Sequence, residues 1–71
     1  MPRVEVKSEV AGTVCKIEAP QGAAVNQGDL IMLIECMKME IPVNAPHAGI
    51  VRFVVAEAET VTERQVLAII E

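Results

Sequence analysis

Hydrophobic residues along this chain form short runs and alternating stretches separated by turn residues, and the pattern predicts β-strands. Most of the apolar positions hold Val, Ile or Leu, and the β-branched residues among them favour extended backbone. Turn signals fall at "PQG" (20–22), "NQGD" (26–29) and "NAPH" (44–47). The predicted strands are residues 3–7, 12–18, 30–36, 39–44, 49–56 and 65–70, with shorter pieces near 24–25 and 60–61.

The second half of the chain repeats the first. "VAGTVCKIEA" (10–19) aligns with "HAGIVRFVVA" (47–56) at an offset of 37, which sets Ile17 against Val54. With one residue closed near Pro20, "LIMLIE" (30–35) aligns with "VLAIIE" (66–71) at an offset of 36. A chain made of two copies of one unit of about 36 residues predicts a fold with a pseudo-two-fold axis.

The repeat also decides between helix and strand for residues 29–40. Leu, Met, Glu and Lys are good helix formers, and Pro42 could end a helix there. However, apolar residues occupy every side of the helical wheel, and the second copy, "VLAIIE", is typical of a strand. Because two related units share one structure, we expect strands in both. Short, evenly spaced strands without helices predict an all-β sandwich or barrel of two packed sheets.

Composition and charge narrow the possible functions. The net charge is −4, and the chain has no Trp or Tyr, so a nucleic-acid surface is not expected. No apolar run approaches the ~20 residues of a membrane helix, and no signal peptide is visible, so no membrane association is expected. Cys15, Cys36 and His47 lack the spacing of a metal site. Two isolated cysteines fit a reducing cytoplasm, which is the expected location.

The stretch "IECMKMEIPV" (34–43) lies where the two repeats join. Only residues 36–39 connect the copies, so Met37 and Lys38 are predicted to form a two-residue hairpin loop. Such loops require positive φ, which costs Met and Lys about 1 kcal/mol each. Local stability given up at a turn suggests a function, here a lysine amine presented to a partner protein. Met37 and Met39 offer a polarizable apolar collar, and Glu35 and Glu40 bracket the turn as possible contacts for basic groups.

"ECMKME" closely resembles the attachment motif of biotinyl domains, in which Ala or Ser usually precedes Met-Lys-Met. The resemblance extends over the chain through "AGTV", "GDLIMLIE", "EIPVNAPHAGIV" and "VLAIIE". It implies a single domain over residues 1–71, with half-repeats at about 3–35 and 40–71 and the attachment hairpin at 36–39. The implied fold is a flattened β-barrel, or barrel-sandwich hybrid, of two four-stranded antiparallel sheets.

The resemblance also implies a function, that of a biotin carboxyl carrier. Lys38 would be biotinylated by a biotin protein ligase, and Met37 and Met39 would serve recognition. Glu35 and Glu40, which the position beside the turn and not the resemblance singles out, are possible ligase contacts. As a swinging arm, covalent biotin would carry the carboxyl group, as carboxybiotin, between the biotin carboxylase and the carboxyltransferase of a biotin-dependent carboxylase such as acetyl-CoA carboxylase. The chain itself is expected to be a carrier and not an enzyme, monomeric when isolated.

The sequence departs from the family pattern at a few positions. Cys36 replaces the usual small residue, Ala58 stands where the first copy has Gly22, and Arg64 stands where it has Gly28. Residues 20–29 leave no room for the protruding thumb of some bacterial carriers. Two alternatives stay open. One is a lipoyl carrier domain, in which the lysine is typically flanked by Asp and Ala. The other is an unmodified barrel-sandwich interaction module.

Overall fold

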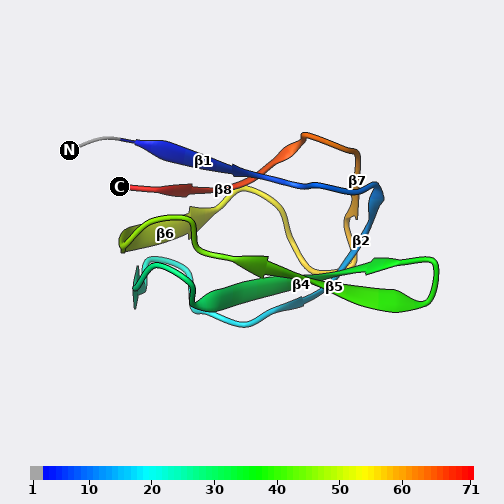
Figure 1. Ribbon diagram of the computed structural model, residues 1–71, viewed down its shortest axis with the longest axis horizontal. Helices are drawn as coiled ribbons and strands as arrows, with labels where there is room; N and C mark the ends of the chain where they lie inside the picture. Colours follow the sequence, from blue (N-terminus) through cyan, green and yellow to red (C-terminus); the bar gives the residue numbers. More distant parts are fainter. Residues whose placement is uncertain (1–2) are drawn as a thin grey trace.

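The computed structural model describes residues 3–71 and confirms the all-β prediction. Residues 1 and 2 of the predicted domain lie outside the described residues. Two four-stranded antiparallel sheets have the strand orders β1-β8-β6-β3 and β5-β4-β2-β7 (Figure 1). The strands are β1 (Val4–Lys7), β2 (Gly12–Ile17), β3 (Ala24–Val25), β4 (Leu30–Cys36), β5 (Met39–Asn44), β6 (Gly49–Phe53), β7 (Thr60–Val61) and β8 (Val66–Ile70).

The sheet topology confirms the predicted pseudo-two-fold repeat. The repeat offset converts β1, β2, β3 and β4 into β5, β6, β7 and β8. Applied to the first sheet, this exchange turns the order β1-β8-β6-β3 into β5-β4-β2-β7, which is the order of the second sheet. Each sheet therefore contains strands from both halves of the chain, and neither half forms a sheet by itself.

The core lies between the two sheets and is built from residues that the repeat relates. Ile31 and Leu67 are fully buried, as are Ile34 and Ile70 and also Val14 and Val51. The bulky Met32 has the small Ala68 as its repeat mate, and both are buried. The domain measures 35 × 19 × 18 Å, and β1 and β5 are edge strands of different sheets. The fold is therefore a flattened sandwich that is not closed into a continuous barrel. The described part of the chain contains no helix that could cross a membrane.

The register of the repeat differs from the sequence alignment over one stretch. Val14 pairs with Ile34 as Val51 pairs with Ile70, so Val14 corresponds to Val51 at an offset of 37. Three residues later, Ile17 pairs with Met32 as Phe53 pairs with Ala68, an offset of 36. The extra residue of the first copy is therefore Cys15, which lies in a β-bulge between Val14 and Lys16. The expected match of Ile17 with Val54, and the gap near Pro20, are wrong because the bulge absorbs the residue earlier.

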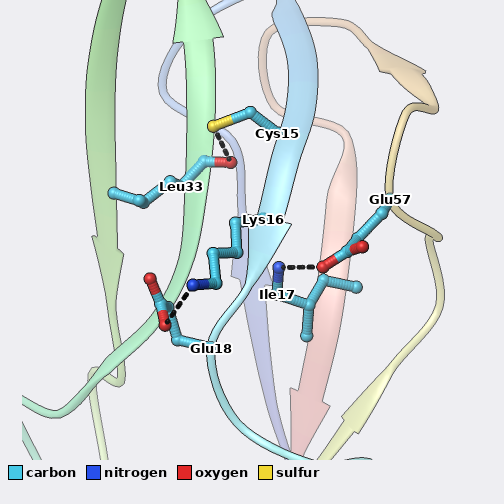
Figure 2. Close-up of polar contacts among 6 residues, drawn as sticks. All are labelled: Cys15, Lys16, Ile17, Glu18, Leu33 and Glu57. Carbon is cyan, nitrogen blue, oxygen red and sulfur yellow. Dashed lines mark hydrogen bonds and ion pairs between the residues drawn. The ribbon is translucent and has the colours of Figure 1, made fainter.

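Side-chain hydrogen bonds confirm the corrected register. The Ile17 N–H donates to the carboxylate of Glu57 at 2.9 Å (Figure 2), and the Phe53 N–H donates to Oε1 of Gln21 at 2.6 Å. Gln21 and Glu57 are repeat mates, so the same contact is made twice. The Gln21 amide also donates to the Phe53 carbonyl at 3.1 Å. The Gln21 side chain thus bonds both the N–H and the C=O of Phe53. Strand β6 ends there, earlier than the predicted end at residue 56.

In two exposed turns, the second copy adopts the left-handed backbone conformation without glycine. Gly22 and Gly28 have φ angles of +81° and +91°, and their repeat mates Ala58 and Arg64 have φ angles of +74° and +71°. The Ala58 N–H is held by the Val14 carbonyl at 2.7 Å, and the Gly22 N–H by the Val51 carbonyl at 2.9 Å. The tertiary hydrogen bond therefore imposes the left-handed conformation even on a residue with a Cβ atom, for which it is unfavourable.

We expect Ala58→Gly to stabilise the domain by about 0.5–1 kcal/mol, because relief of the left-handed conformation outweighs the extra entropy of the unfolded chain. Thermal unfolding measured by circular dichroism would show the midpoint rise by a few degrees. Ala56→Gly is the matched control, since Ala56 is exposed and is not among the residues with positive φ. That control should lower the midpoint. A lower midpoint for Ala58→Gly as well would contradict the expectation.

The β4–β5 turn lies at one end of the domain, and the start of β1 and the end of β8 lie at the other (Figure 1). At one end, Val4 of β1 pairs with Ile70 of β8. At the other end, the hairpin turn joins Cys36 to Met39. The pseudo-two-fold axis exchanges these two ends. In one sheet the turn joins β4 to β5, whereas their mates β8 and β1 in the other sheet are not joined.

Candidate functional site

The candidate site is the turn between β4 and β5, and its backbone is held in an unfavourable conformation. Cys36 pairs with Met39, which leaves Met37 and Lys38 as a two-residue loop, as predicted. Their φ angles are +53° and +66°, the arrangement of a type I′ turn. This turn matches the twist of the two strands, but Asn and Gly suit it far better than Met and Lys. The strands therefore impose the turn, and the chain keeps two poorly suited residues in it.

The Lys38 side chain is exposed at the tip of this turn and has no ionic partner in the described part of the chain. The protein has three lysines. Nζ of Lys7 lies 3.9 Å from Glu5, and Nζ of Lys16 lies 3.9 Å from Glu18 (Figure 2). Lys38 makes no such pair among residues 3–71. Its amine is therefore the one lysine amine there that a second protein can reach without first breaking an ion pair.

The two methionines are among the exposed large apolar residues. Met37 is 89% exposed and Met39 is 62% exposed. Side chains of directly paired residues point to the same face of a sheet, and the face changes at each step along the strand. Because Ile34 and Ile41 face the core, Cys36 and Met39 lie on the continuation of that inner face beyond the core. The inner face of the hairpin is therefore apolar, and the thiol of Cys36 is half-buried there, as expected for a residue facing along the sheet.

The outer face of the hairpin is acidic. Glu35 and Glu40 are direct cross-strand partners, and both are exposed. Like charges at opposed positions destabilise a strand pair, by tenths of a kcal/mol to about 1 kcal/mol. In the other half of the domain, Glu71 is the mate of Glu35 and is paired with Arg52 at 3.7 Å. The structure therefore brings Glu35 and Glu40 together beside Lys38, and neither has a basic partner among residues 3–71.

Cys15 adds a feature of the site that the sequence did not reveal. Its bulge places the thiol on the acidic face, where the S–H donates to the Leu33 carbonyl at 3.4 Å (Figure 2). Partial desolvation raises the pKa of Cys15, and the negative charges of Glu40 and Glu35 raise it further. A thiol with a raised pKa is a poor nucleophile. The only sequence signal is the change of repeat offset from 37 to 36, which shows that the first copy has one extra residue but not where that residue lies.

The arrangement suits covalent modification better than catalysis by the domain itself. Within residues 3–71, no group of three or more His, Cys, Asp or Glu side chains is placed to hold a metal ion. His47 is exposed in a turn, with Nδ1 3.3 Å from the Ala48 carbonyl. The hairpin offers an accessible amine, an apolar inner face and an acidic outer face. It can therefore be recognised from both faces and acylated at the tip.

Comparison with known proteins gives one matching family and several relatives. The model of the family described as "Biotin-requiring enzyme" matches residues 3–34 and 21–70. The chain is 42% identical over 64 residues to the biotin-dependent acyl-coenzyme A carboxylase alpha3 subunit of Mycobacterium leprae, covering 89% of this chain and 11% of that protein. It is 43% identical over 47 residues to the biotinylated protein TB7.3 homolog of the same organism, covering 66% of each.

Solved structures show the same fold. The urea carboxylase of Kluyveromyces lactis superposes with a TM-score of 0.92 at 29% identity, covering all of this chain and 6% of that one. The lipoyl domain of the 2-oxoglutarate dehydrogenase complex from Azotobacter vinelandii gives a TM-score of 0.73 at 30% identity, covering 87% and 80%. The chain thus spans a small part of each of these two carboxylases, and most of the length of the lipoyl domain.

Proposed function

The chain belongs to the family of biotin- and lipoyl-attachment domains, and on that premise we propose that it is a biotin carboxyl carrier with biotin in amide linkage to Nζ of Lys38. The observation that supports Lys38 is its place at the tip of a type I′ turn, with an unpaired amine between two exposed methionines. The residues fit the cofactor, because an amide requires a reachable amine and a ligase requires a surface to grip. Bound biotin supplies the ability to accept and release a carboxyl group.

Attachment is an acyl transfer in which Lys38 is the nucleophile. The amine attacks the acyl carbon of biotinyl-adenylate, a C–N bond forms, the bond from that carbon to the phosphate oxygen breaks, and AMP leaves. An alkylammonium has no lone pair, so Lys38 must lose a proton before it attacks. No side chain among residues 3–71 hydrogen-bonds to its amine, and the base is therefore assigned to the biotin protein ligase.

The remaining hairpin residues take recognition roles in this proposal. Met37 and Met39 form the apolar surface that the ligase grips, and Glu35 and Glu40 meet basic groups of the ligase. The carboxylates of Glu35 and Glu40 repel each other in the free hairpin, and on docking each would gain a basic partner on the ligase. The same hairpin would then visit a biotin carboxylase and a carboxyltransferase. Tethering replaces diffusion of free biotin with a high effective concentration at each active site.

The domain acts as a carrier, and the catalytic groups belong to its partners. The relatives are named as a biotinylated protein and as a subunit of a biotin-dependent carboxylase. We propose the same kind of partners for this chain, in a cytoplasmic setting that suits two free cysteines, with the dilute protein monomeric. The chain could fill this role either as a part of a longer carboxylase or as a separate subunit.

A lipoyl carrier is the second candidate, and the superposition on a lipoyl domain supports it. Biotinyl and lipoyl domains share this scaffold, so the residues around the lysine must distinguish between the two cofactors. Met37 and Met39 match the biotinyl motif and replace the Asp and Ala that are typical of lipoyl domains, which favours biotin. An unmodified interaction module is disfavoured because it gives no reason for keeping Met and Lys in a type I′ turn.

The deciding experiment is the intact mass of the protein after co-expression with a biotin protein ligase and, separately, with a lipoate–protein ligase. We expect one biotin-sized increment in the first culture, mapped by proteolysis to the peptide containing Lys38, and none in the second. A lipoyl-sized increment alone would assign the chain to the lipoyl carriers. Unmodified protein in both cultures would point to an interaction module.

The methionines are expected to serve docking and not folding. Because Met37 and Met39 are exposed, the double variant Met37→Leu/Met39→Leu should change the free energy of unfolding by less than about 0.5 kcal/mol. Its kcat/KM for biotinylation should fall by roughly five- to tenfold, as the loss of ~1 kcal/mol of sulfur contacts predicts.

Met32→Leu is the matched control for the methionine pair, since Met32 is fully buried in the same strand pair. That control should alter thermal stability and leave biotinylation kinetics unchanged. Lower stability with normal biotinylation in the double variant would show that the exposed methionines act in the fold.

A further inference from the structure

Two of the edge strands, β1 and β5, line opposite sides of a cleft that the hairpin function does not use. The cleft has a volume of about 250 Å³. Its walls are segments that the repeat relates, residues 5–10 on one side and residues 41–44 with Pro46 on the other, and Ile34 also lines it. The cleft therefore lies on the pseudo-two-fold axis, and differences between its walls can be compared residue by residue.

Strand β1 carries backbone N–H and C=O groups that make no hydrogen bond among residues 3–71. Ile50 and Glu71 exchange two hydrogen bonds, at 2.8 and 3.0 Å. Since the bonding direction alternates along a strand, Ile69 also bonds toward β6. Its partner in β1, Glu5, is therefore left without a bond to β8. Ser8 bonds inward through both of its peptide groups, to Gln65 and Arg64. The N–H and C=O groups of Glu5 and Lys7 thus point away from the sheet, at the spacing of a strand partner.

The β5 wall lacks this capacity. The repeat mate of Glu5 is Pro42, which has no N–H, and it lies at the same non-bonded position opposite Leu33. A proline at the outward position of an edge strand blocks further strand pairing. The pseudo-two-fold axis relates these two edges, yet β5 is protected against the addition of another strand and β1 is not.

The charges of β1 are complementary to those of a second β1. The segment reads "RVEVKSE" from Arg3 to Glu9. In an antiparallel pair centred on Val6, Glu5 of each copy faces Lys7 of the other, and Arg3 faces Glu9. The pairs of Glu5 with Lys7 would be the hydrogen-bonded ones, because both residues have outward peptide groups. Centring on Glu5 would instead oppose Glu5 with Glu5 and Arg3 with Lys7. Charge therefore selects the first register.

We propose that the β1 edge is a self-association surface, where a second copy of this chain adds its own β1 antiparallel to the first and joins two four-stranded sheets into one. Glu5 and Lys7 are exposed and lie on one face of the sheet, since Nζ of Lys7 is 3.9 Å from Oε1 of Glu5. In the dimer this ion pair within one copy is replaced by pairs between Glu5 of each copy and Lys7 of the other. The interface is small, so the dimer is weak and the monomer prevails in dilute solution. The hairpin lies at the far end of β4 and β5 and stays free.

The test is sedimentation equilibrium of the unmodified protein and of charge variants. The weight-average mass should rise toward that of a dimer over roughly 0.1–2 mM, the weak range expected of an interface below 1,200 Å². Glu5→Lys and Lys7→Glu should each weaken association by about tenfold or more, because each variant opposes like charges in two symmetric pairs. A 1:1 mixture of the two variants should associate as a heterodimer, since both positions are basic in one variant and acidic in the other.

The double variant Glu5→Lys/Lys7→Glu is the matched control, because it has the composition of the parent chain and restores self-complementarity. It should dimerise like the parent. Glu5→Pro gives a second, independent variant: it copies Pro42, removes no hydrogen bond within the domain, and should abolish association with the thermal midpoint retained. A parent protein that stays monomeric at about 2 mM, or single reversals that associate as the parent does, would overturn the proposal. Neither result bears on biotinylation of Lys38.

Discussion

Lys38→Arg should carry no biotin at all after co-expression with a biotin protein ligase. Arginine keeps the positive charge, the long side chain and the strained turn, but its guanidinium is always protonated and offers no free amine for acylation. The expected change is complete loss of the biotin-sized mass increment, the largest functional effect available from one substitution. Intact-mass spectrometry of parent and variant, purified side by side, measures it.

Two controls separate a lost nucleophile from a lost fold. Because Lys38 is exposed and unpaired among residues 3–71, the variant should unfold at the same temperature as the parent. Lys16→Arg changes an exposed lysine that is paired with Glu18, and it should keep full biotinylation. An increment that persists in Lys38→Arg and disappears in Lys16→Arg or Lys7→Arg would assign attachment to another strand and refute the proposed site.

Gly12→Ala is expected to give the largest loss of stability. A Cβ atom at residue 12 would lie 2.9 Å from Cγ2 of Ile34 and closer still to the Glu35 carbonyl oxygen. The oxygen belongs to the backbone of the strand that leads to the hairpin, so relief requires β2 and β4 to move apart. Overpacking against backbone should cost about 3 kcal/mol or more. In a 71-residue domain this is a large share of the total stability, with the thermal midpoint lower by about 15 °C.

The pseudo-two-fold axis supplies the controls for this prediction. Gly49 is the mate of Gly12, and a Cβ there would lie 2.6 Å from the Glu71 carbonyl oxygen and 2.7 Å from Cγ2 of Ile70. Gly49→Ala should therefore be as harmful to stability. Gly22→Ala places its Cβ in open space and bears only the left-handed penalty of about 1 kcal/mol. Equal losses in Gly12→Ala and Gly22→Ala would show that backbone conformation, and not the contact with β4, is what matters at residue 12.

The internal repeat is what made the fold predictable from the sequence. Taken alone, residues 29–40 have the composition of a helix, and the helical wheel together with the β-rich second copy identified strands there. The predicted turn at Met37 and Lys38 followed from the few residues between the copies. The position of the bulge could not be predicted, because Cys15 has no mate and an alignment with a later gap also gives good matches, such as Ala19 with Ala56. Hydrogen bonds from the Ile17 N–H to Glu57 and from the Phe53 N–H to Gln21 resolve it.

The electrostatics of the site were predictable only in part. The sequence shows that Glu35 and Glu40 flank the turn, but not that they are direct partners on one face, since a shift of one residue would place them on opposite faces. The strand pairing fixes that relation. The unequal edges of β1 and β5 were likewise hidden, because which peptide groups face outward depends on the hydrogen-bond phase of each ladder.

The separation of the chain ends from the hairpin makes the domain a rigid lever. A polypeptide joined to β1 or β8 holds the domain at one end of its 35 Å axis, and Lys38 is carried at the other. A rotation at such a joint moves the amine along an arc whose radius is the length of the sandwich, before any flexibility of an attached group is counted. The reach of the carrier is therefore set first by the length of its strands.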